Sequence, residues 1–309
     1  MDLKKTAHFW SFAKYPVLFG ILAFVLYQCR DIFEKAISHG VDSLFLIEAL
    51  FVFQCGVFLL AWRLQLFLTS AGIQRGYLKV LRAYLESVPY YFISPSGLGL
   101  ELARYIKLKP KENEKASMVI SLLVDRVAGV VGAVCVSLFG AHILLELVGI
   151  ETPKNVASVI FVILLLCFCF VGIILKITSI RNKILTVLNS YRTYKAKLGL
   201  GIVISVFIQL SIGLSTYLIA CAFGMMPDLY SVLWVSALGM VLIIIPASIL
   251  GFNLLDIPTG YIYSFAGFPL ADATFLILIA YFLRVWLAVQ GGILEMVYHD
   301  RLTVNDAKS

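Results

Sequence analysis

Charged side chains are scarce in this chain of 309 residues. Lys, Arg, Asp and Glu make up 14% of it, whereas hydrophobic residues make up 61%. A soluble domain carries about 25% charged residues, because its surface must interact with water. The scarcity excludes a secreted disulfide scaffold, a disordered chain and a nucleic-acid-binding protein, and it predicts an integral membrane protein.

Metal-ligand patterns are missing as well. The six cysteines lie in apolar segments without a zinc-like CxxC pair, and the four histidines are scattered without an HxxxH or HxxE companion. Zinc sites need such ligands at short, regular spacings. We therefore expect no metal and no cofactor, and we interpret the cysteines as small core residues.

Long apolar runs are plentiful instead. A helix needs about 20 apolar residues to cross the hydrocarbon core of a bilayer. Six windows of this size occur, at roughly residues 9–28, 44–68, 117–148, 156–176, 198–222 and 273–297. We interpret the first as a retained helix rather than a signal peptide, because no small-x-small cleavage site follows it.

Two further apolar stretches are interrupted by proline. Segment 77–108 breaks near Pro95 and segment 229–265 breaks near Pro246, and each ends in a helix too short to span a membrane. Irregular backbone at membrane depth persists only where protein or a water-filled cavity satisfies its polar groups. The sequence thus predicts an all-α polytopic membrane protein with six full spans and two broken re-entrant helical hairpins, about eight apolar helices in all.

Lysine and arginine are distributed asymmetrically over this topology. With the N-terminus inside and both hairpins returning to the side they came from, the inner segments hold 19 of the 25 basic residues. Cytoplasmic loops are enriched in Lys and Arg. We therefore expect a multi-pass protein of the cell inner membrane with cytoplasmic N- and C-termini. Three arginines, Arg63, Arg126 and Arg284, belong to neither side.

An internal repeat is also indicated. Gly72, Pro95 and the Arg126-Val pair each recur about 150 residues later. Aligned glycines and prolines also arise by chance in apolar chains. An arginine near the bilayer centre costs about 2.5–3.5 kcal/mol of insertion free energy, so its recurrence is harder to explain by chance. We expect the whole chain, 1–309, to be one transmembrane domain without a soluble domain. Its two antiparallel halves are repeat A, about 44–148 with hairpin 77–108, and repeat B, about 198–297 with hairpin 229–265.

The candidate substrate-binding residues lie around the first break and on the later helices, where Asp125, Arg126, Asp256 and Arg284 are included and the two arginines are expected to hold the lipid phosphate. Glu101 and Arg104 share a helix face, and Ser96, Gly97 and Gly99 precede or open that helix. A helix start within the membrane presents free N–H groups to an anionic phosphate, and the glycines permit a close approach of a headgroup. The alternative interpretation is that Glu101 only neutralises an arginine.

Ion pairs are needed for the charges on the long helices, because Arg126 and Arg284 both lie near mid-membrane. The predicted pairs are Arg126 with Glu101, Asp125 with Arg104, and Arg284 with Asp256. We expect Arg63 to extend towards the cytoplasmic headgroups. Glu48, Glu86 and Glu295 are interpreted as interfacial carboxylates rather than as a proton path.

A family resemblance follows from these motifs. The string 62-WRLQLFLTSAG-72, the Pro-Ser-Gly-Leu-Gly-x-Glu-x-x-Arg run ending at Arg104, and the Asp125-Arg126-Val-x-Gly129 helix resemble the lysylphosphatidylglycerol synthase transmembrane region family of flippase-like membrane proteins, over about residues 10–297. The resemblance implies a lipid-translocating membrane domain. Because the sequence ends at Ser309, we expect no aminoacyl-tRNA-dependent transferase domain and no lipid synthesis. Asp256 stands where the family typically has a glutamate.

Three functions remain open at this stage. The first is a lipid transporter that moves a phospholipid, an aminoacyl lipid or a polyprenyl-phosphate carrier between leaflets, with an anionic lipid headgroup as its ligand and envelope-biosynthesis enzymes as possible partners. The second is a membrane-embedded transferase in which Glu101, Asp125 and Asp256 act as base or bind Mg²⁺. The third is a non-catalytic scaffold of envelope synthesis. We favour the first and expect no enzymatic activity.

Overall fold

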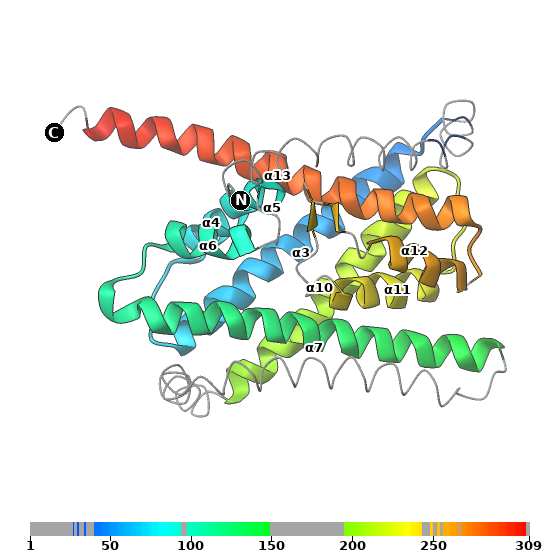
Figure 1. The fold of residues 1–309 in the computed structure, drawn as a ribbon, viewed down its shortest axis with the longest axis horizontal. Helices are drawn as coiled ribbons and strands as arrows, with labels where there is room; N and C mark the ends of the chain where they lie inside the picture. Colours follow the sequence, from blue (N-terminus) through cyan, green and yellow to red (C-terminus); the bar gives the residue numbers. More distant parts are fainter. Residues whose placement is uncertain are drawn as a thin grey trace, which may run out of the picture.

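The computed structural model (Figure 1) describes Tyr27, Arg30, Glu34 and residues 40–93, 98–148, 195–242, 248–249, 252–253, 256–265 and 267–306. Its elements, in chain order, are α3 (Ser43–Ser70), α4 (Tyr77–Ser87), α5 (Pro89–Ile93), α6 (Leu98–Leu108), the 3₁₀ turn η1 (Glu112–Glu114), α7 (Lys115–Val148), α10 (Lys195–Ala222), α11 (Leu229–Leu242), β1 (Ser248–Ile249), β2 (Phe252–Asn253), α12 (Asp256–Phe265) and α13 (Leu270–Asp306). Helices dominate, since β1 and β2 form only a two-residue antiparallel pairing. The predicted all-α fold class is confirmed.

Within the described residues, four helices are long and apolar enough to cross a membrane. These spans are Ser43–Ser70, Glu112–Phe139, Ala196–Ala222 and Leu270–Val297. They match four of the six predicted spans, and the other two, 9–28 and 156–176, lie outside the described residues. The chain is therefore a polytopic helical membrane protein.

The two interrupted stretches each form a pair of short helices. Helices α4 and α6 have 11 residues each, or about 16 Å at 1.5 Å per residue, which is half of a ~30 Å hydrocarbon core. They pack against each other, as do α11 and α12. Pro89 contributes to the first break, because a proline has no N–H to continue the hydrogen bonds of α4. Both short pairs have the dimensions of the predicted broken hairpins.

Equivalent turns end the long helices that precede the two pairs. Gly72 after α3 and Gly224 after α10 have φ values of 80° and 76°. The next N–H in each case reaches back into the helix, from Ile73 to the carbonyl of Leu68 and from Met225 to the carbonyl of Ala220. This is the Schellman arrangement. It favours glycine at the residue just after the helix, because that residue has a positive φ.

Helices α3 and α10 run antiparallel through the centre of the structure (Figure 1). The N–H of Asp42 donates to the carbonyl of Ala222 at one end, and the Phe67 ring lies over Gly201 at the other. Helices α7 and α13 flank this pair. The first short pair packs through α4 on α13, and the second packs through α11 on α7. Each short pair therefore contacts the long helix that follows the other one.

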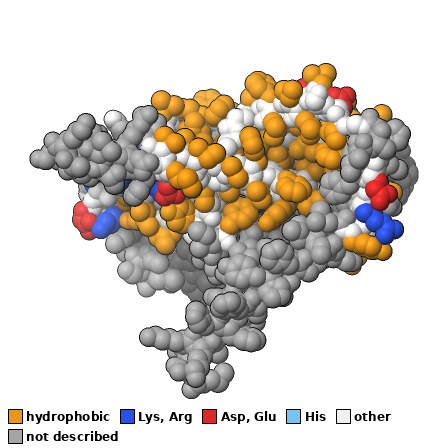
Figure 2. Space-filling model, turned by 90° about the horizontal axis from the view of Figure 1, so that it is seen from above, with side chains coloured by type: hydrophobic (Ala, Val, Ile, Leu, Met, Phe, Trp, Pro, Cys, Tyr) orange, Lys and Arg blue, Asp and Glu red, His pale blue; other side chains and the backbone are white. Residues whose placement is uncertain are grey.

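The surface of the described helices is largely apolar. Figure 2 shows hydrophobic side chains spread over one face, with charged side chains towards its ends. Among the described residues, Phe51, Phe139 and Phe207 are large hydrophobic side chains that are exposed. A soluble monomer rarely exposes a continuous apolar area of this kind, so the surface suits a lipid environment.

Gly291 tests how the first short pair docks on α13. A Cβ atom at Gly291 would lie 2.0 Å from the carbonyl oxygen of Leu85, whereas one at the adjacent Gly292 would meet nothing within 4 Å. We expect Gly291→Ala to destabilise the purified protein by about 1–3 kcal/mol, because backbone must move to admit the methyl group. Thermal unfolding in detergent measures this, with Gly292→Ala as the matched control. Equal effects of the two substitutions would contradict the packing.

Candidate functional site

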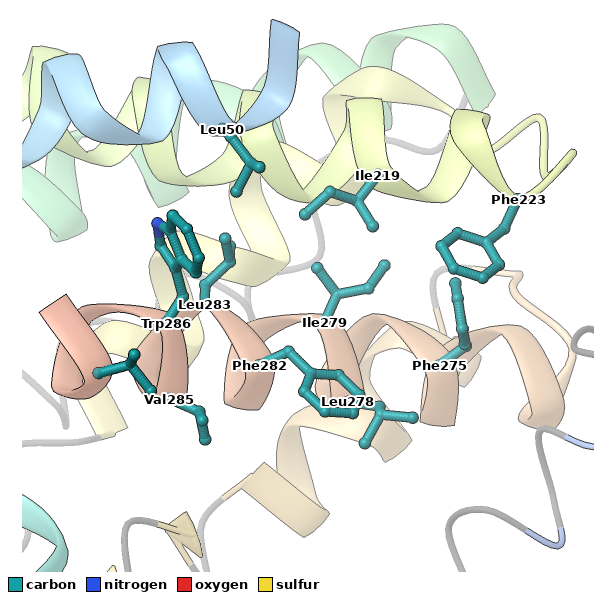
Figure 3. Close-up of a pocket in the computed structure, with 11 residues that line it drawn as sticks. Leu50, Ile219, Phe223, Phe275, Leu278, Ile279, Phe282, Leu283, Val285 and Trp286 are labelled. Carbon is teal, nitrogen blue, oxygen red and sulfur yellow. The ribbon is translucent and has the colours of Figure 1, made fainter. Parts of the chain in front are cut away.

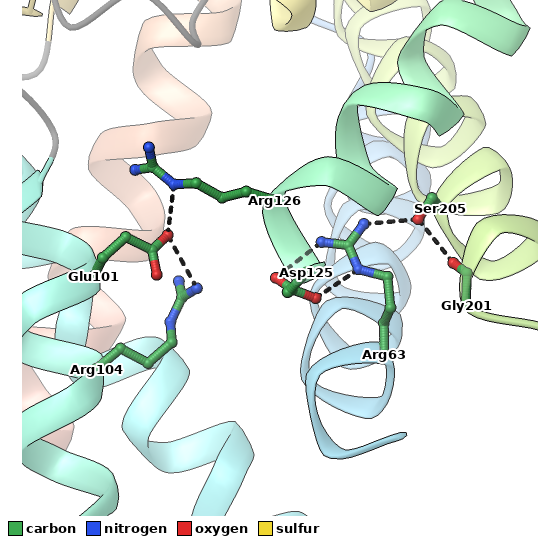
Figure 4. Close-up of polar contacts among 7 residues, drawn as sticks. All are labelled: Arg63, Glu101, Arg104, Asp125, Arg126, Gly201 and Ser205. Atoms are coloured by element: carbon green, nitrogen blue, oxygen red, sulfur yellow. Dashed lines mark hydrogen bonds and ion pairs between the residues drawn. The ribbon is translucent and has the colours of Figure 1, made fainter. Parts of the chain in front are cut away.

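A cluster of three charged side chains joins the first short pair to α7 (Figure 4). Arg126 Nε donates to Glu101 Oε1 at 3.0 Å, and Arg104 Nη1 lies 3.5 Å from the same oxygen. Glu101 occupies the first turn of α6, where a carboxylate interacts favourably with the helix dipole. The predicted pairing of Glu101 with Arg126 is confirmed. We call these residues the Glu101 cluster.

Arg104 is the most deeply buried member of the Glu101 cluster. Arg104 is only 2% exposed, and its guanidinium carbon lies 3.9 Å from the centre of the Tyr84 ring. Stacking on an aromatic face stabilises a desolvated cation. Helix α6 therefore presents both a carboxylate and a cation, one turn apart, towards α4 and α7.

Hydrogen-bonding capacity is left over in the Glu101 cluster. The Arg126 side chain is 40% exposed, and within the described residues its Nη1 and Nη2 have no hydrogen-bond acceptor. Glu101 Oε2 and Arg104 Nε are buried and have no hydrogen-bond partner among the described residues. With two guanidinium groups and one carboxylate, the cluster carries an excess of one positive charge. These features fit an anionic ligand that also forms hydrogen bonds.

A second charged cluster lies on the other side of α7. Arg63 donates from Nε to Asp125 Oδ1 at 2.7 Å, from Nη2 to Asp125 Oδ2 at 3.1 Å and from Nη1 to Ser205 Oγ at 2.9 Å. The Ser205 hydroxyl in turn donates to the carbonyl of Gly201. Arg63 and Asp125 are both nearly inaccessible. This Arg63 cluster ties α3, α7 and α10 together and uses all three guanidinium nitrogens.

Two predictions about these residues are wrong. Asp125 pairs with Arg63 and not with Arg104, and Arg63 is buried instead of extending to the headgroups. Adjacent residues on a helix point about 100° apart, so Asp125 and Arg126 face different neighbours. Gly129, one turn after Asp125, leaves room for the Arg63 guanidinium, whose Nη1 would lie 3.3 Å from a Cβ there. The four-residue spacing of Asp125 and Gly129 puts the carboxylate and this space on one face of α7, but it does not identify Arg63 as the partner.

Five further residues were predicted to belong to the site, and the structure describes the side chains or positions of some of them. Gly99 lies in the first turn of α6 and is partly buried, and Arg284 lies partly buried in α13. Ser96 and Gly97 lie outside the described residues. Asp256 begins α12, but its side chain is not among those described, so the Arg284–Asp256 pair stays a prediction.

The carboxylates of Glu86 and Glu295 meet at a lysine. Lys107 Nζ lies 3.3 Å from Glu86 Oε2 and also pairs with Glu295, which accepts a 3.0 Å hydrogen bond from the Tyr90 hydroxyl. Glu86 is buried, so its interpretation as an interfacial carboxylate is wrong. The network links α4, α5 and α6 to α13. It holds the first short pair in place beside the Glu101 cluster.

An apolar pocket lies elsewhere in the structure, between α3, α10 and the first half of α13 (Figure 3). Its volume is about 340 Å³, and all eleven lining residues are hydrophobic, among them Leu50, Phe223 and Trp286. A pocket without polar groups can accept hydrocarbon but cannot recognise a charged headgroup. Within the described part of the chain, no group of three or more His, Cys, Asp or Glu side chains is arranged to hold a metal ion.

The fold and the buried charged clusters define a polytopic helical membrane protein with polar groups inside its transmembrane region. The family model for the lysylphosphatidylglycerol synthase TM region matches residues 15–292, and the chain belongs to this family. The family implies a membrane role related to lipids. No curated protein and no solved structure matches the chain.

The Arg63 cluster makes a prediction about stability. Replacing Asp125 by Asn leaves Arg63 as an uncompensated buried cation, and we expect a loss of about 3–5 kcal/mol. The double substitution Arg63→Met with Asp125→Leu removes both charges and should recover most of this loss. Thermal unfolding of the purified variants measures both. If the double variant is as unstable as Asp125→Asn, the ion pair is not the cause.

Proposed function

We propose that this protein transports a phosphate-bearing lipid between the leaflets of the inner membrane, without chemical change to the lipid. The observation that carries the proposal is the Arg126 guanidinium, which lies in the middle of a membrane helix with two nitrogens available to a ligand. Membership of a lipid-related family supports the same function. Arg side chains bind phosphate through parallel N–H donors, and their charge persists on burial.

The depth of Arg126 suits this function. Arg126 lies eleven residues after Lys115, the first residue of α7, and so about 16 Å along the helix. A charge at this depth is costly unless it is paired, and Glu101 supplies the pair when no lipid is bound. A lipid phosphate that reaches Arg126 adds a second anion to a cluster with one excess positive charge. Arg126 thus supplies a positive charge to the anionic headgroup near the middle of the membrane, where transfer of a charge into hydrocarbon costs most.

The two-fold arrangement of the helices supports a second, equivalent route. Long helix, short pair and long helix occur twice in the chain, and α3 and α10 run antiparallel. We propose that the halves form an inverted repeat in which Arg284 has the role of Arg126 for the opposite leaflet. In transporters built from inverted repeats, substrate sites lie near the midplane at broken helices.

Loop charges support an orientation. At one end of the structure, segments 71–76 and 109–114 contain Arg75, Lys109 and Lys111, whereas segments 223–228 and 267–269 at the other end contain no Lys or Arg (Figure 1). We propose that the basic end faces the cytoplasm, with both termini there. Enzymes of envelope biosynthesis that make or use the lipid are the proposed partners.

Orientation is tested with single cysteines in a version that lacks the native ones. We expect Met226→Cys, in the exposed 223–228 segment, to react with an impermeant maleimide in intact cells. Lys111→Cys should react only after the inner membrane is permeabilised. The reverse pattern would invert the proposed orientation.

Transport is tested with the purified protein in liposomes that contain lipids labelled on an acyl chain. Dithionite reduces only label in the outer leaflet, so its reaction reports exchange between leaflets. We expect the protein to accelerate the exchange of an anionic phospholipid, and Arg126→Ala to slow it at least tenfold, because one good charge-assisted contact is worth about 1.5–3 kcal/mol.

The matched control is Lys79→Ala, which removes an exposed positive charge from α4 outside the Glu101 cluster. It should exchange lipid at the rate of the unsubstituted protein. Exchange that is no faster with the protein than without it, for every headgroup tried, would refute the function. Equal loss in both variants would refute the role of Arg126.

A further inference from the structure

The apolar pocket of Figure 3 occupies a gap between α3 and α13. Helix α10 packs against both of these helices, whereas α3 and α13 have few close contacts with each other. The side chains that α13 contributes are spaced at helical intervals from Phe275 to Val289, so they belong to one face of the helix. Every lining residue except Phe223, which directly follows α10, lies within a membrane-spanning helix. The pocket is therefore at membrane depth.

The pocket has an exposed rim and a buried floor. Phe282 and Val289 are exposed, whereas Ile279 and Leu283 are buried. The pocket thus opens on the outer surface of the helices, which faces lipid. An apolar cavity does not hold water, because a water molecule needs polar partners. Hydrocarbon is the chemistry that this lining can bind.

A pair of side chains bounds each end of the pocket. At the end near segment 223–228, the rings of Phe223 and Phe275 pack edge to face with their centres 5.0 Å apart. Beyond the other end, Gln290 Nε2 donates to Gln54 Oε1 at 3.1 Å across the gap between α13 and α3. Both glutamines lie one helical turn after lining residues of the same helices. The surroundings therefore change from apolar to polar at a defined depth.

The length of the pocket suits a hydrocarbon chain that lies within one leaflet. Val289 follows Phe275 by fourteen residues, so the pocket extends about 21 Å along α13. One leaflet contributes about 15 Å of hydrocarbon along the membrane normal, and a tilted helix covers the same depth over a greater length. A chain that enters beside Phe223 and follows α13 therefore ends near the glutamine pair. A longer chain places methylene groups against the amides.

We propose that the pocket between α3, α10 and α13 is a binding site for one hydrocarbon chain of a membrane phospholipid, and that the hydrogen bond between Gln54 and Gln290 limits the length of this chain. Removal from water does not drive the binding, because the surrounding lipid is as apolar as the pocket. Selection depends on dispersion contacts, which a chain of matching length makes along the whole pocket. The site is separate from the Glu101 cluster, concerns the chain and not the headgroup, and does not depend on lipid transport.

Tryptophan fluorescence tests the site, because bromine atoms on a lipid chain quench a tryptophan that they contact. Trp286 lines the pocket and Trp62 lies on α3 outside it, and both are 44% exposed. Two versions of the protein each keep one of them and have phenylalanine at the other three tryptophan positions. In liposomes with increasing fractions of a brominated phospholipid, we expect quenching of Trp286 to saturate at low fractions. Quenching of Trp62 should follow the fraction of brominated lipid in the bilayer.

Three results would overturn the site. Curves of the same shape for both tryptophans would mean that Trp286 meets only the lipids that surround the protein. A Trp286 that is not quenched would mean that another part of the chain or a second copy of the protein fills the pocket. Ile279→Phe adds atoms to the floor and should give Trp286 the curve of Trp62, so an unchanged saturable curve in this variant is the third.

Chain length tests the limit set by Gln54 and Gln290. The probes are two phospholipids with the same headgroup and the same bromine position, one with palmitoyl chains and one with behenoyl chains, which reach beyond the pocket. We expect the palmitoyl lipid to give half-maximal quenching of Trp286 at an about threefold lower fraction, since a hydrogen bond between side chains within a membrane is worth about a threefold change in equilibrium. Trp62 should show no difference between the two lipids.

Replacing both glutamines by leucine should bring this ratio to about one. Equal fractions for the two lipids in the protein that keeps both glutamines would overturn the length limit, and so would a threefold preference that persists after the double substitution. Both measurements report contact with a chain and not its movement between leaflets. They therefore test the site even if the liposome assay detects no lipid exchange.

Discussion

A buried guanidinium must find its counter-charge inside the protein, and this constraint organises the described helices. Hydrocarbon offers no water to solvate Arg63, Arg104 or Arg126, so each of them meets a carboxylate from another turn or another helix. The contacts are made where the helices cross. Asp125 and Arg126 point in different directions from α7, so Asp125 connects α7 to α3 and Arg126 connects it to α6. Arg63 extends the first connection to Ser205 of α10. The positions of the helices around α7 depend on these pairs.

The broken pairs depend on the same constraint. A short helix inside a membrane exposes backbone groups at its start that need partners, and its first turn favours a negative charge. Glu101 lies in that turn of α6. The same residue forms ion pairs with two arginines, so the break places a carboxylate where the long helix needs one. Lys107 repeats the pattern at the other end of α6, where it joins Glu86 and Glu295 and fixes the pair against α13.

The lengths of the apolar runs and the proline positions predicted the long helices and the two broken pairs, because both features reflect the length of chain that hydrocarbon accommodates. The Glu101–Arg126 pair was predictable from depth and opposite charge. The partner of Asp125 was not, since the rotation of α7 relative to α3 and α6 is set by packing of all three helices. Arg63 illustrates the limit: it lies seven residues before the end of α3, and in the sequence this position is compatible with the headgroups or with a buried pair. The roles of Arg284 and Asp256, and the inverted repeat, stay predictions.

The two charged clusters differ in how many of their hydrogen-bonding atoms have a partner. This difference distinguishes a structural cluster from a candidate binding site. In the Arg63 cluster every guanidinium nitrogen has a partner, both carboxylate oxygens are used, and side chains are nearly inaccessible, so no ligand can enter without breaking a bond. In the Glu101 cluster one carboxylate oxygen serves two arginines while the other oxygen and an Arg104 nitrogen stay unpaired. A purely structural ion pair would lose stability by leaving such groups unsatisfied in a protein interior. Their retention in a cluster that is partly open at Arg126 is the physical reason for proposing a ligand site there and a structural role for the Arg63 cluster.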